Sequence, residues 1–490
     1  MQQTAFAVGV TTVLTSPPIP LAREFEPASR ADWLALVEKT LKGQGIDSLV
    51  TRGPDGLAIA PLYEETLAPE GFELAPRGGE GPWDIRALVR NPSPAVARNA
   101  VLEDLAGGAA SVVLAIRREG SEGVAITSAE DLAKVLDEAL IDLAPVALDA
   151  GFLGPKAADW LSKAAKGSPA APLALHLDPL STFAATGKSP GPIESHLIAA
   201  ANTAARLAAV HSKASLLLAT GAVVHEAGGA PAEELAFALA SAVAYLKATT
   251  RAGLSMEAAT AGIVIGLTVD GDPLVSTAKL RAARLVWARL TGACGAPSRA
   301  LIEARSSHRM LTRTEPWTNL VRLTAACHAA AVGGADAIIL GAFTDAIGVP
   351  TAFGRRMARN TQLILMDEGH LGVVADPVGG SGAFEALTRE IARAAWAKFN
   401  AIEAAGGLVA ALRDGLIARE VAKSRQSLAA AIASGAQRIV GVTDFRGVDT
   451  HPAPVEAPPS GLPPAPEARL PGPDSACPAL GPVSVEDLAA

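Results

Sequence analysis

The sequence predicts an α/β fold built on a closed (β/α)8 barrel, and three observations carry that prediction. Short apolar runs alternate with Ala-rich stretches of helical periodicity along most of the 490 residues. Hydrophobic residues make up 49% of the chain, whereas aromatic residues make up only 4%. Aliphatic cores of this kind favour helices packed on a buried parallel sheet over a β-sandwich.

Eight short runs form the candidate strands, and most of them precede a helical stretch. The runs are 111–116, 123–126, 145–150, 173–177, 215–220, 262–269, 299–305 and 335–341. Strand–helix alternation implies right-handed parallel crossovers, and eight units over about 230 residues have the size of a closed barrel. The interval between the first two runs is too short for a full helix, and a doubly wound open sheet is the alternative.

Composition divides the chain into four parts. Residues 1–92 are an N-terminal arm of the dimerisation type, with a helix over 25–42 that starts near Ser29, followed by Gly/Pro-rich turns. Residues 93–345 form the barrel and residues 346–448 a helical region. Residues 449–490 contain 11 prolines and no aromatic residue, so we predict a disordered tail.

Charge and cysteine content narrow the class of protein. The net charge is −8, which argues against nucleic acid or an anionic membrane surface as partner. Three cysteines without a C-x-x-C pair predict neither a disulfide framework nor a zinc site, and no histidine spacing suggests another metal. With no apolar stretch of membrane-spanning length, we expect a soluble protein of the reducing cytoplasm.

An ordered series of segments carries a family resemblance. The segments are KLRAAR at 279–284, RTEPWTNLVR at 313–322, GVPT at 348–351, ARNTQLIL at 358–365 and DPVGGS at 376–381, with PWDIR at 82–86 and EAG at 226–228 upstream. In this order they resemble the acyl-CoA-binding barrel of the methylmalonyl-CoA mutase family, over about residues 25–440.

The resemblance implies a site and a cofactor. In this family the barrel encloses a CoA thioester along its axis, and a separate C-terminal domain supplies cobalamin, whose cobalt–carbon bond breaks to give a radical. The resemblance carries over only two candidate contacts, namely Arg86 for the acyl-CoA substrate and Glu226 on the cobalamin side.

The departures from the family pattern fall on its chemical residues. Catalytic members continue P-W-T-I-R with Gln and a Tyr that points at the reacting carbon, where this chain has Ala87 and Leu88. Catalytic members also carry the segment G-Y-H-M-Q-E-A-G. This chain has Ala222 in place of its Tyr and Val223 in place of its catalytic His. His225 lies two residues further on, at the family's Gln, and is not expected to replace the lost His.

Other polar positions have changed in the same direction. The seventh-strand pattern R-x-H-x-Q has become 301–305, LIEAR, and the His and Asn of the eighth strand have become Ile339 and Gly341. The cobalt-binding motif D-x-H-x-x-G does not occur. The helices and turns are retained while the chemical residues are replaced, which is typical of a pseudo-enzyme subunit.

We therefore expect a chain that has no catalytic residues and binds no cofactor itself. The resemblance implies a non-catalytic small subunit, paired in a heterodimer with a catalytic large subunit that holds adenosylcobalamin and interconverts methylmalonyl-CoA and succinyl-CoA. Two alternatives remain open. One is a free-standing acyl-CoA mutase-like enzyme with its cobalamin domain on another chain, and the other is a regulatory module that binds CoA esters.

Overall fold

The described part of the N-terminal arm contains a capped helix. A computed structural model describes residues 26, 28–53, 56–63, 81–118, 122–168, 171–447, 451–457 and 461–489. Its contacts divide the chain into two compact units, Met1–Thr51 and Arg52–Ala490. The first contains helix α1 (Arg30–Thr40) and the 3-10 turn η1 (Ile46–Leu49). Ser29 starts α1 as predicted, because its hydroxyl accepts from the Asp32 amide at 3.2 Å while the Asp32 carboxylate accepts from the Ser29 amide at 3.0 Å.

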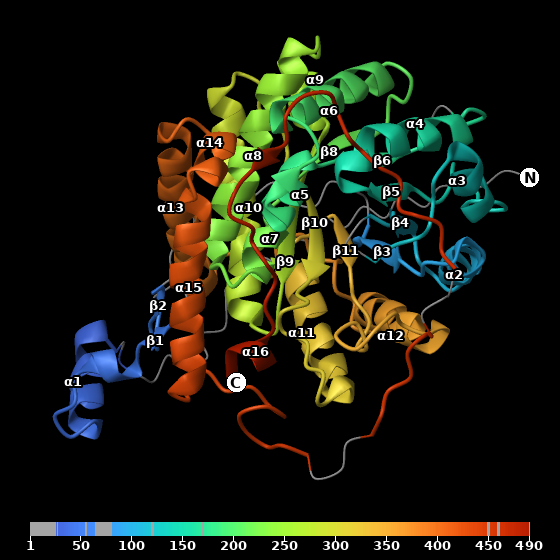
Figure 1. Ribbon diagram of the computed structural model, residues 1–490. Helices are drawn as coiled ribbons and strands as arrows, with labels where there is room; N and C mark the ends of the chain where they lie inside the picture. The colour runs from blue at the N-terminus through green and yellow to red at the C-terminus, as the bar shows by residue number, and fades with distance from the viewer. Residues whose placement is uncertain are drawn as a thin grey trace, which may run out of the picture. The chain divides into compact units, whose positions relative to one another are not determined.

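The second unit is built around a closed barrel of eight parallel strands, which confirms the predicted fold class (Figure 1). The strands are β3 (Asp84–Val89), β4 (Ser111–Ala115), β5 (Val146–Asp149), β6 (Ala174–Leu177), β8 (Ser215–Thr220), β9 (Ile263–Val269), β10 (Leu301–Ser306) and β11 (Ala337–Ile339). They follow the order β10-β11-β3-β4-β5-β6-β8-β9, and β9 pairs with β10 to close the ring. Two-residue strands β1 (Thr51–Arg52) and β2 (Ala58–Ile59) precede the barrel.

The first strand of the barrel lies where the sequence predicted turns of the arm. Seven of the eight predicted runs overlap barrel strands, but the run 123–126 is not one of them. It folds back beside the end of β4 and forms only an isolated bridge between Ile116 and Val124. The true first strand is β3, so the predicted boundary at residues 92/93 cuts into the barrel. The misassignment has a physical reason, since β3 carries Asp84 and Arg86 on the face that points into the barrel.

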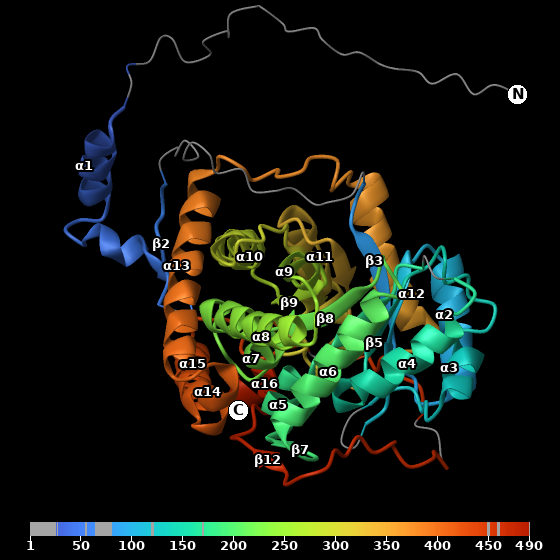
Figure 2. The same cartoon turned by 90° about the horizontal axis from the view of Figure 1, so that it is seen from above.

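Helices surround the strands (Figure 2). They are α2 (Pro94–Ala106), α3 (Ala129–Val135), η2 (Gly151–Leu153), α4 (Gly154–Ala164), α5 (Pro179–Thr186), α6 (Ile193–Ala208), α7 (Ala222–Glu226), α8 (Pro231–Arg251), α9 (Met256–Ala261), α10 (Pro273–Ala293), η3 (Pro316–Thr318) and α11 (Asn319–Val332). Most of the core lies between this layer and the strands and is aliphatic, with a few large side chains such as Phe237, Tyr245 and Trp287. No helix of the described residues is long and apolar enough to cross a membrane.

The helical region predicted after the barrel is present. It consists of α12 (Ala352–Leu363), the π-helical turn η4 (Ile364–Glu368), α13 (Gly382–Ala404), α14 (Leu408–Arg413) and α15 (Leu416–Ala433). Helix α13 packs against α8 and α10. Buried Arg281 on α10 fixes its start by donating to Glu385 at 2.6 Å and Asp376 at 2.9 Å.

The Pro-rich tail was predicted to be disordered, and for its described residues this is wrong. Residues 461–489, which we call the belt, run along loops that follow the barrel strands (Figure 1). Strand β12 (Ser475–Ala476) pairs antiparallel with β7 (Lys188–Ser189), and the belt ends in helix α16 (Val485–Ala489). Earlier in the belt, Pro463 O accepts from Arg117 and Glu467 O from Lys156.

The belt is ordered by contacts that composition does not reveal. The amide of Cys477 donates to Gly187 O and that of Leu480 to Ala184 O on α5, both at 2.8 Å, and the Leu480 side chain is only 4% exposed. Proline also restricts the unfolded chain, which lowers the entropy lost when an extended segment docks. The segment therefore uses the barrel's core in place of one of its own.

Amide exchange tests this order directly. We expect the amides of Cys477 and Leu480 to exchange at least about tenfold more slowly than in an unfolded chain, because each is hydrogen-bonded to a carbonyl in or at the end of α5. Leu480→Asp should abolish that protection by placing a carboxylate in an apolar contact. Hydrogen-exchange mass spectrometry would contradict the docked belt if the wild-type amides exchanged at unfolded rates.

Candidate functional site

The inside of the barrel is lined in part by small apolar side chains. Val113, Ala147, Ala174 and Ile339 form a buried cluster apart from the main core, with Leu88 packed against it. They come from five different strands. A Cβ added at Gly266 on β9 would lie 2.6 Å from the Cβ of Thr220, its partner on β8, so a larger residue does not fit at this position. Leu88, which stands in the place of a family Tyr, has become part of this packing.

An ion-pair network lies in the same interior, nearer to the amino ends of the strands. Arg86 on β3 donates to Glu303 on β10 at 2.6 Å, to Asp84 at 2.7 Å and to the Ser111 hydroxyl at 2.9 Å. Strands β3 and β10 are separated by β11, so the Arg86 and Glu303 side chains meet inside the barrel. Burial opposes the charge of Arg86, but Asp84 and Glu303 outweigh it and raise its pKa.

The network continues towards the carboxyl ends of the strands. Asp149 on β5 lies 3.4 Å from Arg305 on β10 and 3.3 Å from Arg118. Burial alone would raise the pKa of Asp149, but these two arginines lower it. Arg86, Arg118 and Arg305 thus balance Asp84, Asp149 and Glu303, leaving the interior close to neutral. Balanced pairs of this kind are the way in which a protein can bury charges.

His176 lies at the centre of the network in an unusual backbone conformation. Its Nε2 atom is 3.8 Å from Glu303 and has no hydrogen-bond partner among the described residues. Its φ of 46° lies in the left-handed region, and the β6–β8 register shifts across it. Burial lowers the pKa of His176 to about 4, so the imidazole is neutral at pH 7.

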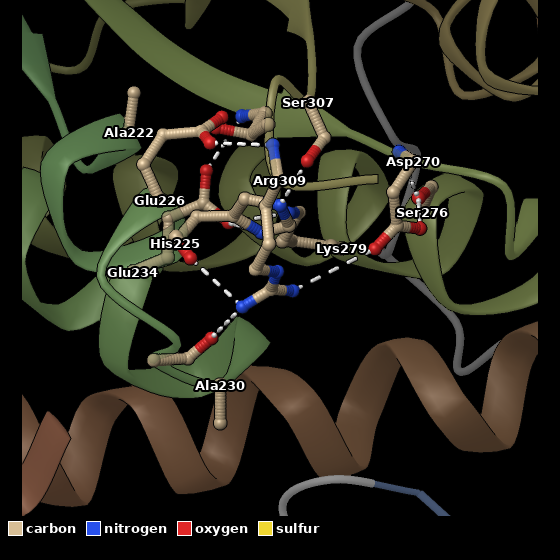
Figure 3. Close-up of polar contacts among 12 residues, drawn as sticks. Ala222, His225, Glu226, Ala230, Glu234, Asp270, Ser276, Lys279, Ser307 and Arg309 are labelled. Atoms are coloured by element: carbon tan, nitrogen blue, oxygen red, sulfur yellow. Dashed lines mark hydrogen bonds and ion pairs between the residues drawn. The ribbon is translucent and has the colours of Figure 1, made fainter. Parts of the chain in front are cut away.

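The residues that follow β8 sit on the short helix α7 and form a second cluster (Figure 3). Val223, at the place of the catalytic His, is partly buried and packs against the main apolar core. His225 is buried, with Nε2 2.8 Å from the Ser307 hydroxyl and Nδ1 3.6 Å from Glu234. His225 is therefore engaged in holding α7 to α8 and to the end of β10.

Glu234 is the centre of this second cluster. Its carboxylate binds buried Lys279 on α10 and accepts from the Thr268 amide on β9 at 2.5 Å. Burial would raise the pKa of Glu234, but Lys279 and His225 outweigh it and lower the pKa to about 2. The carboxylate is ionised and ties two helices to a strand, which is a structural task.

Glu226 joins the loop after β8 to the loop after β10. Its two carboxylate oxygens accept from the amides of His308 at 3.0 Å and Arg309 at 2.8 Å. Arg309 in turn donates to the carbonyl of His225 at 2.8 Å (Figure 3). The belt then docks on both loops, with Val483 N donating to Glu226 O at 2.8 Å and Val485 N to Arg309 O at 3.0 Å.

The hydrogen bonds of Glu226 matter for the question of whether the chain could hold cobalamin. The residue that the resemblance places on the cobalamin side, Glu226, has both oxygens occupied by backbone amides, and its carbonyl is covered by the belt. No group of His, Cys, Asp or Glu among the described residues is arranged to hold a metal ion. Glu226 is thus already engaged in joining the two loops and the belt.

A small cavity lies along β3 and α12. It is lined among others by Arg90, Asp104, Arg355 and Arg359, and its volume is about 30 Å³. That is room for water, whereas organic ligands occupy sites of several hundred Å³. This cavity does not offer a binding site for an acyl-CoA.

Fold and interior together define a (β/α)8 barrel whose axis is packed with its own side chains. Comparison with known proteins identifies its relatives. The family described as "Methylmalonyl-CoA mutase" matches residues 114–460. The chain is 39% identical to the "Methylmalonyl-CoA mutase small subunit" of Streptomyces virginiae, over 92% of this chain and 76% of that protein.

Two further relatives agree. The protein named "Probable methylmalonyl-CoA mutase small subunit" of Mycobacterium tuberculosis is 35% identical, over 81% of this chain and 66% of its own length. The "Methylmalonyl-CoA mutase small subunit" of Propionibacterium freudenreichii subsp. shermanii is 31% identical, over 92% and 75%. The chain belongs to the methylmalonyl-CoA mutase family.

Sequence reasoning identified the replaced positions but not the network that replaced the site. It noted Glu303 and Arg305 as losses of family residues, and it had Arg86 as a candidate substrate contact. The structure shows all three side chains paired inside the barrel. The available signal was the presence of opposite charges on different strands, Arg86 on β3 with Glu303 on β10 and Arg305 on β10 with Asp149 on β5.

The central ion pair should be strongly coupled. Arg86→Met leaves Asp84 and Glu303 buried without their cation and should lower the free energy of unfolding by about 3–5 kcal/mol. Adding Glu303→Leu should recover part of that loss. The matched control is Lys163→Met, because Lys163 and Glu130 are also 2.6 Å apart but both are 65% exposed, and it should change stability by less than about 1 kcal/mol. Equal effects of the arginine and lysine variants in urea titrations would refute the network's role.

His176 should make stability depend on pH. The unfolded chain takes up its proton near pH 6.5 and the folded chain only near pH 4, so between these values the unfolded state binds more protons and stability falls as the pH falls. From pH 7 to pH 5 the wild type should lose about 2 kcal/mol more unfolding free energy than His176→Asn. The control is His328→Asn, at an exposed histidine, and its unfolding free energy should depend on pH as that of the wild type does. If His176→Asn shows the same pH dependence as these two proteins, burial of the neutral imidazole does not affect stability.

Proposed function

We propose that this chain is the non-catalytic small subunit of an adenosylcobalamin-dependent methylmalonyl-CoA mutase. Its partner is a catalytic large subunit, which binds the cofactor and interconverts methylmalonyl-CoA and succinyl-CoA. The observation that supports this best is the Arg86–Glu303–His176 network, which lies along the axis where the family resemblance places the thioester.

Three replaced positions support the same conclusion. Leu88 packs in the interior, Ala222 offers only a methyl group, and Val223 packs against the main core. A radical enzyme needs groups that bind the thioester carbonyl and screen the reacting carbon. Here these places carry hydrocarbon side chains that can donate no hydrogen bond.

The chain's own task would then be structural. The buried clusters around Glu303 and Glu234 fix the strands to one another and to α8 and α10, and the belt holds the loops after β6, β8 and β10 in place. A rigid barrel of this kind can support a catalytic partner. The sparse cysteines, free thiols in the described chain, support a cytoplasmic location for the complex.

Turnover assays test the proposal. The isolated chain with added adenosylcobalamin should isomerise no methylmalonyl-CoA, and the complex with the large subunit should be active. Val223→His should create no activity, because one hydrogen-bond donor contributes about 3–4 kcal/mol only when the rest of the site is in place. His225→Gln in this chain should leave the turnover of the complex within about twofold, since a residue that packs α7 takes no part in the chemistry.

The opposite result has a clear meaning. Turnover by the isolated chain would overturn the non-catalytic assignment and favour a free-standing mutase. A large fall in turnover with His225→Gln, at unchanged stability of the complex, would show that this chain contributes a side chain to the reaction.

A further inference from the structure

The described chain after α15 passes around the carboxyl ends of the barrel strands. In chain order it contacts the segments that follow β11, β4, β5, β6, β8 and β10, which is also the order of these strands around the barrel. In Figure 1 the belt is the red trace that ends in α16, beside α15. The belt is therefore held at several separate points, and they differ in kind. These contacts join Glu456 to Val349, Pro463 to Arg117, Glu467 to Lys156, Leu470 to Pro190, Val483 to Glu226 and Val485 to Arg309.

The middle of the belt is firmly anchored. Strand β12 pairs with β7, and the hydroxyl of buried Ser475 accepts from the Ile193 amide at 3.1 Å. Leu480 ends this anchored part with a buried side chain and an amide that donates to Ala184 O at 2.8 Å. Breaking such bonds leaves buried polar groups without partners, which is costly. We call residues 470–480 the anchor.

The chain changes character immediately after the anchor. Gly481 and Pro482 are exposed, and a Cβ added at Gly481 would meet no atom within 4 Å. Glycine leaves the backbone free to rotate at this point, because no side chain restricts φ and no neighbour crowds it. Gly481 therefore has the properties of a hinge between the anchor and residues 483–489, which we call the flap.

The flap covers the loops after β8 and β10. The Val483 amide donates to Glu226 O at 2.8 Å, and the Val485 amide donates to Arg309 O at 3.0 Å. The Val485 side chain is buried, and the Ser484 hydroxyl caps α16. The flap is thus a small folded unit on the face where (β/α)8 barrels carry their functional loops.

The two loops under the flap are joined without it. The Glu226 carboxylate accepts from the amides of His308 and Arg309, and the Arg309 guanidinium donates to His225 O at 2.8 Å and to Gly229 O at 3.2 Å (Figure 3). None of these bonds uses a flap residue. The flap can therefore lift while the loops keep their positions.

An ion-pair group fastens the flap to the loop between β10 and α11. Arg313 lies 3.1 Å from Glu486 and donates to Asp487 at 2.6 Å, and the Thr314 amide donates to Glu486 at 2.9 Å. Arg313 and Asp487 are 50% and 54% exposed. Water and salt weaken attraction between charges that are exposed to this extent. This fastening, which we call the latch, is therefore easier to release than the anchor.

We propose that the flap opens about Gly481 when the latch is released, and that its opening uncovers the loops after β8 and β10. The anchor stays docked during this motion. The flap thereby controls access to one part of the carboxyl-end face of the barrel. This inference concerns the chain's own fold and goes beyond the proposed function without depending on it.

Hydrogen-exchange mass spectrometry of the full-length chain tests the proposal by comparing peptides of the flap with peptides of the anchor. Arg313→Glu places a third carboxylate beside Glu486 and Asp487, so exchange in the flap should become at least about tenfold faster while exchange in the anchor stays within about twofold. In the wild type, raising NaCl to about 1 M should also speed exchange in the flap. In Arg313→Gln that dependence on salt should be lost.

The matched control is Arg469→Glu. Arg469 and Asp474 are 3.0 Å apart and 53% and 54% exposed, but this ion pair lies within the belt and does not touch the flap. The control should leave exchange in the flap within about twofold of the wild type. Adding Asp487→Arg to Arg313→Glu reverses both charges of one pair and should restore part of the flap's protection.

Three results would overturn the proposal. If Arg313→Glu and salt both leave exchange in the flap unchanged, Arg313 is not the latch. If the anchor and the flap become equally fast, the belt opens as a whole and Gly481 is not the hinge. If Arg469→Glu speeds the flap as much as Arg313→Glu does, the response reflects overall charge. Should Arg313→Glu fail to fold, the salt series of the wild type and Arg313→Gln decides the same question.

Discussion

The ion pair between Arg86 and Glu303 is the interaction on which the rest of this structure depends. It crosses the inside of the barrel at 2.6 Å and is continued by His176 towards Asp149 and Arg305. Charged groups survive burial only when they are paired, so the two halves of the network must be kept together. Among the described residues, a barrel with this interior uses its axis for its own packing and ion pairs.

The outer parts of the fold serve the same rigid arrangement. The carboxylate of Glu234 ties α8 and α10 to β9, while Glu226 bonds the loop after β8 to the loop after β10. The belt then covers these loops through backbone hydrogen bonds. The face of a (β/α)8 barrel that normally carries chemistry is thus closed by the chain's own residues.

The fold class and most strands could be predicted from the sequence because they depend on local patterns of apolar and helix-forming residues. Seven strands were apolar runs before helical stretches, and the family segments occur in the expected order. Strand β3 was missed because Asp84 and Arg86 face the barrel interior. A prediction based on apolar runs does not recognise a buried strand that carries two charged side chains. The ordered conformation of residues such as Leu480 was missed because the Pro-rich segment is held by contacts with parts of the barrel that are distant in the sequence. The lost site residues could be identified from the sequence, but their replacement by ion pairs depends on contacts between strands far apart in the chain.

The most direct test of the central claim is a calorimetric titration of the isolated chain with methylmalonyl-CoA. A barrel whose axis is filled by the Arg86–Glu303 network should give no saturable heat of binding, even at millimolar ligand. The same titration of the complex should show one thioester bound for each large subunit. Saturable binding by the isolated chain, lost in Arg86→Met, would show that the interior opens to admit the thioester and would contradict a closed, self-packed axis.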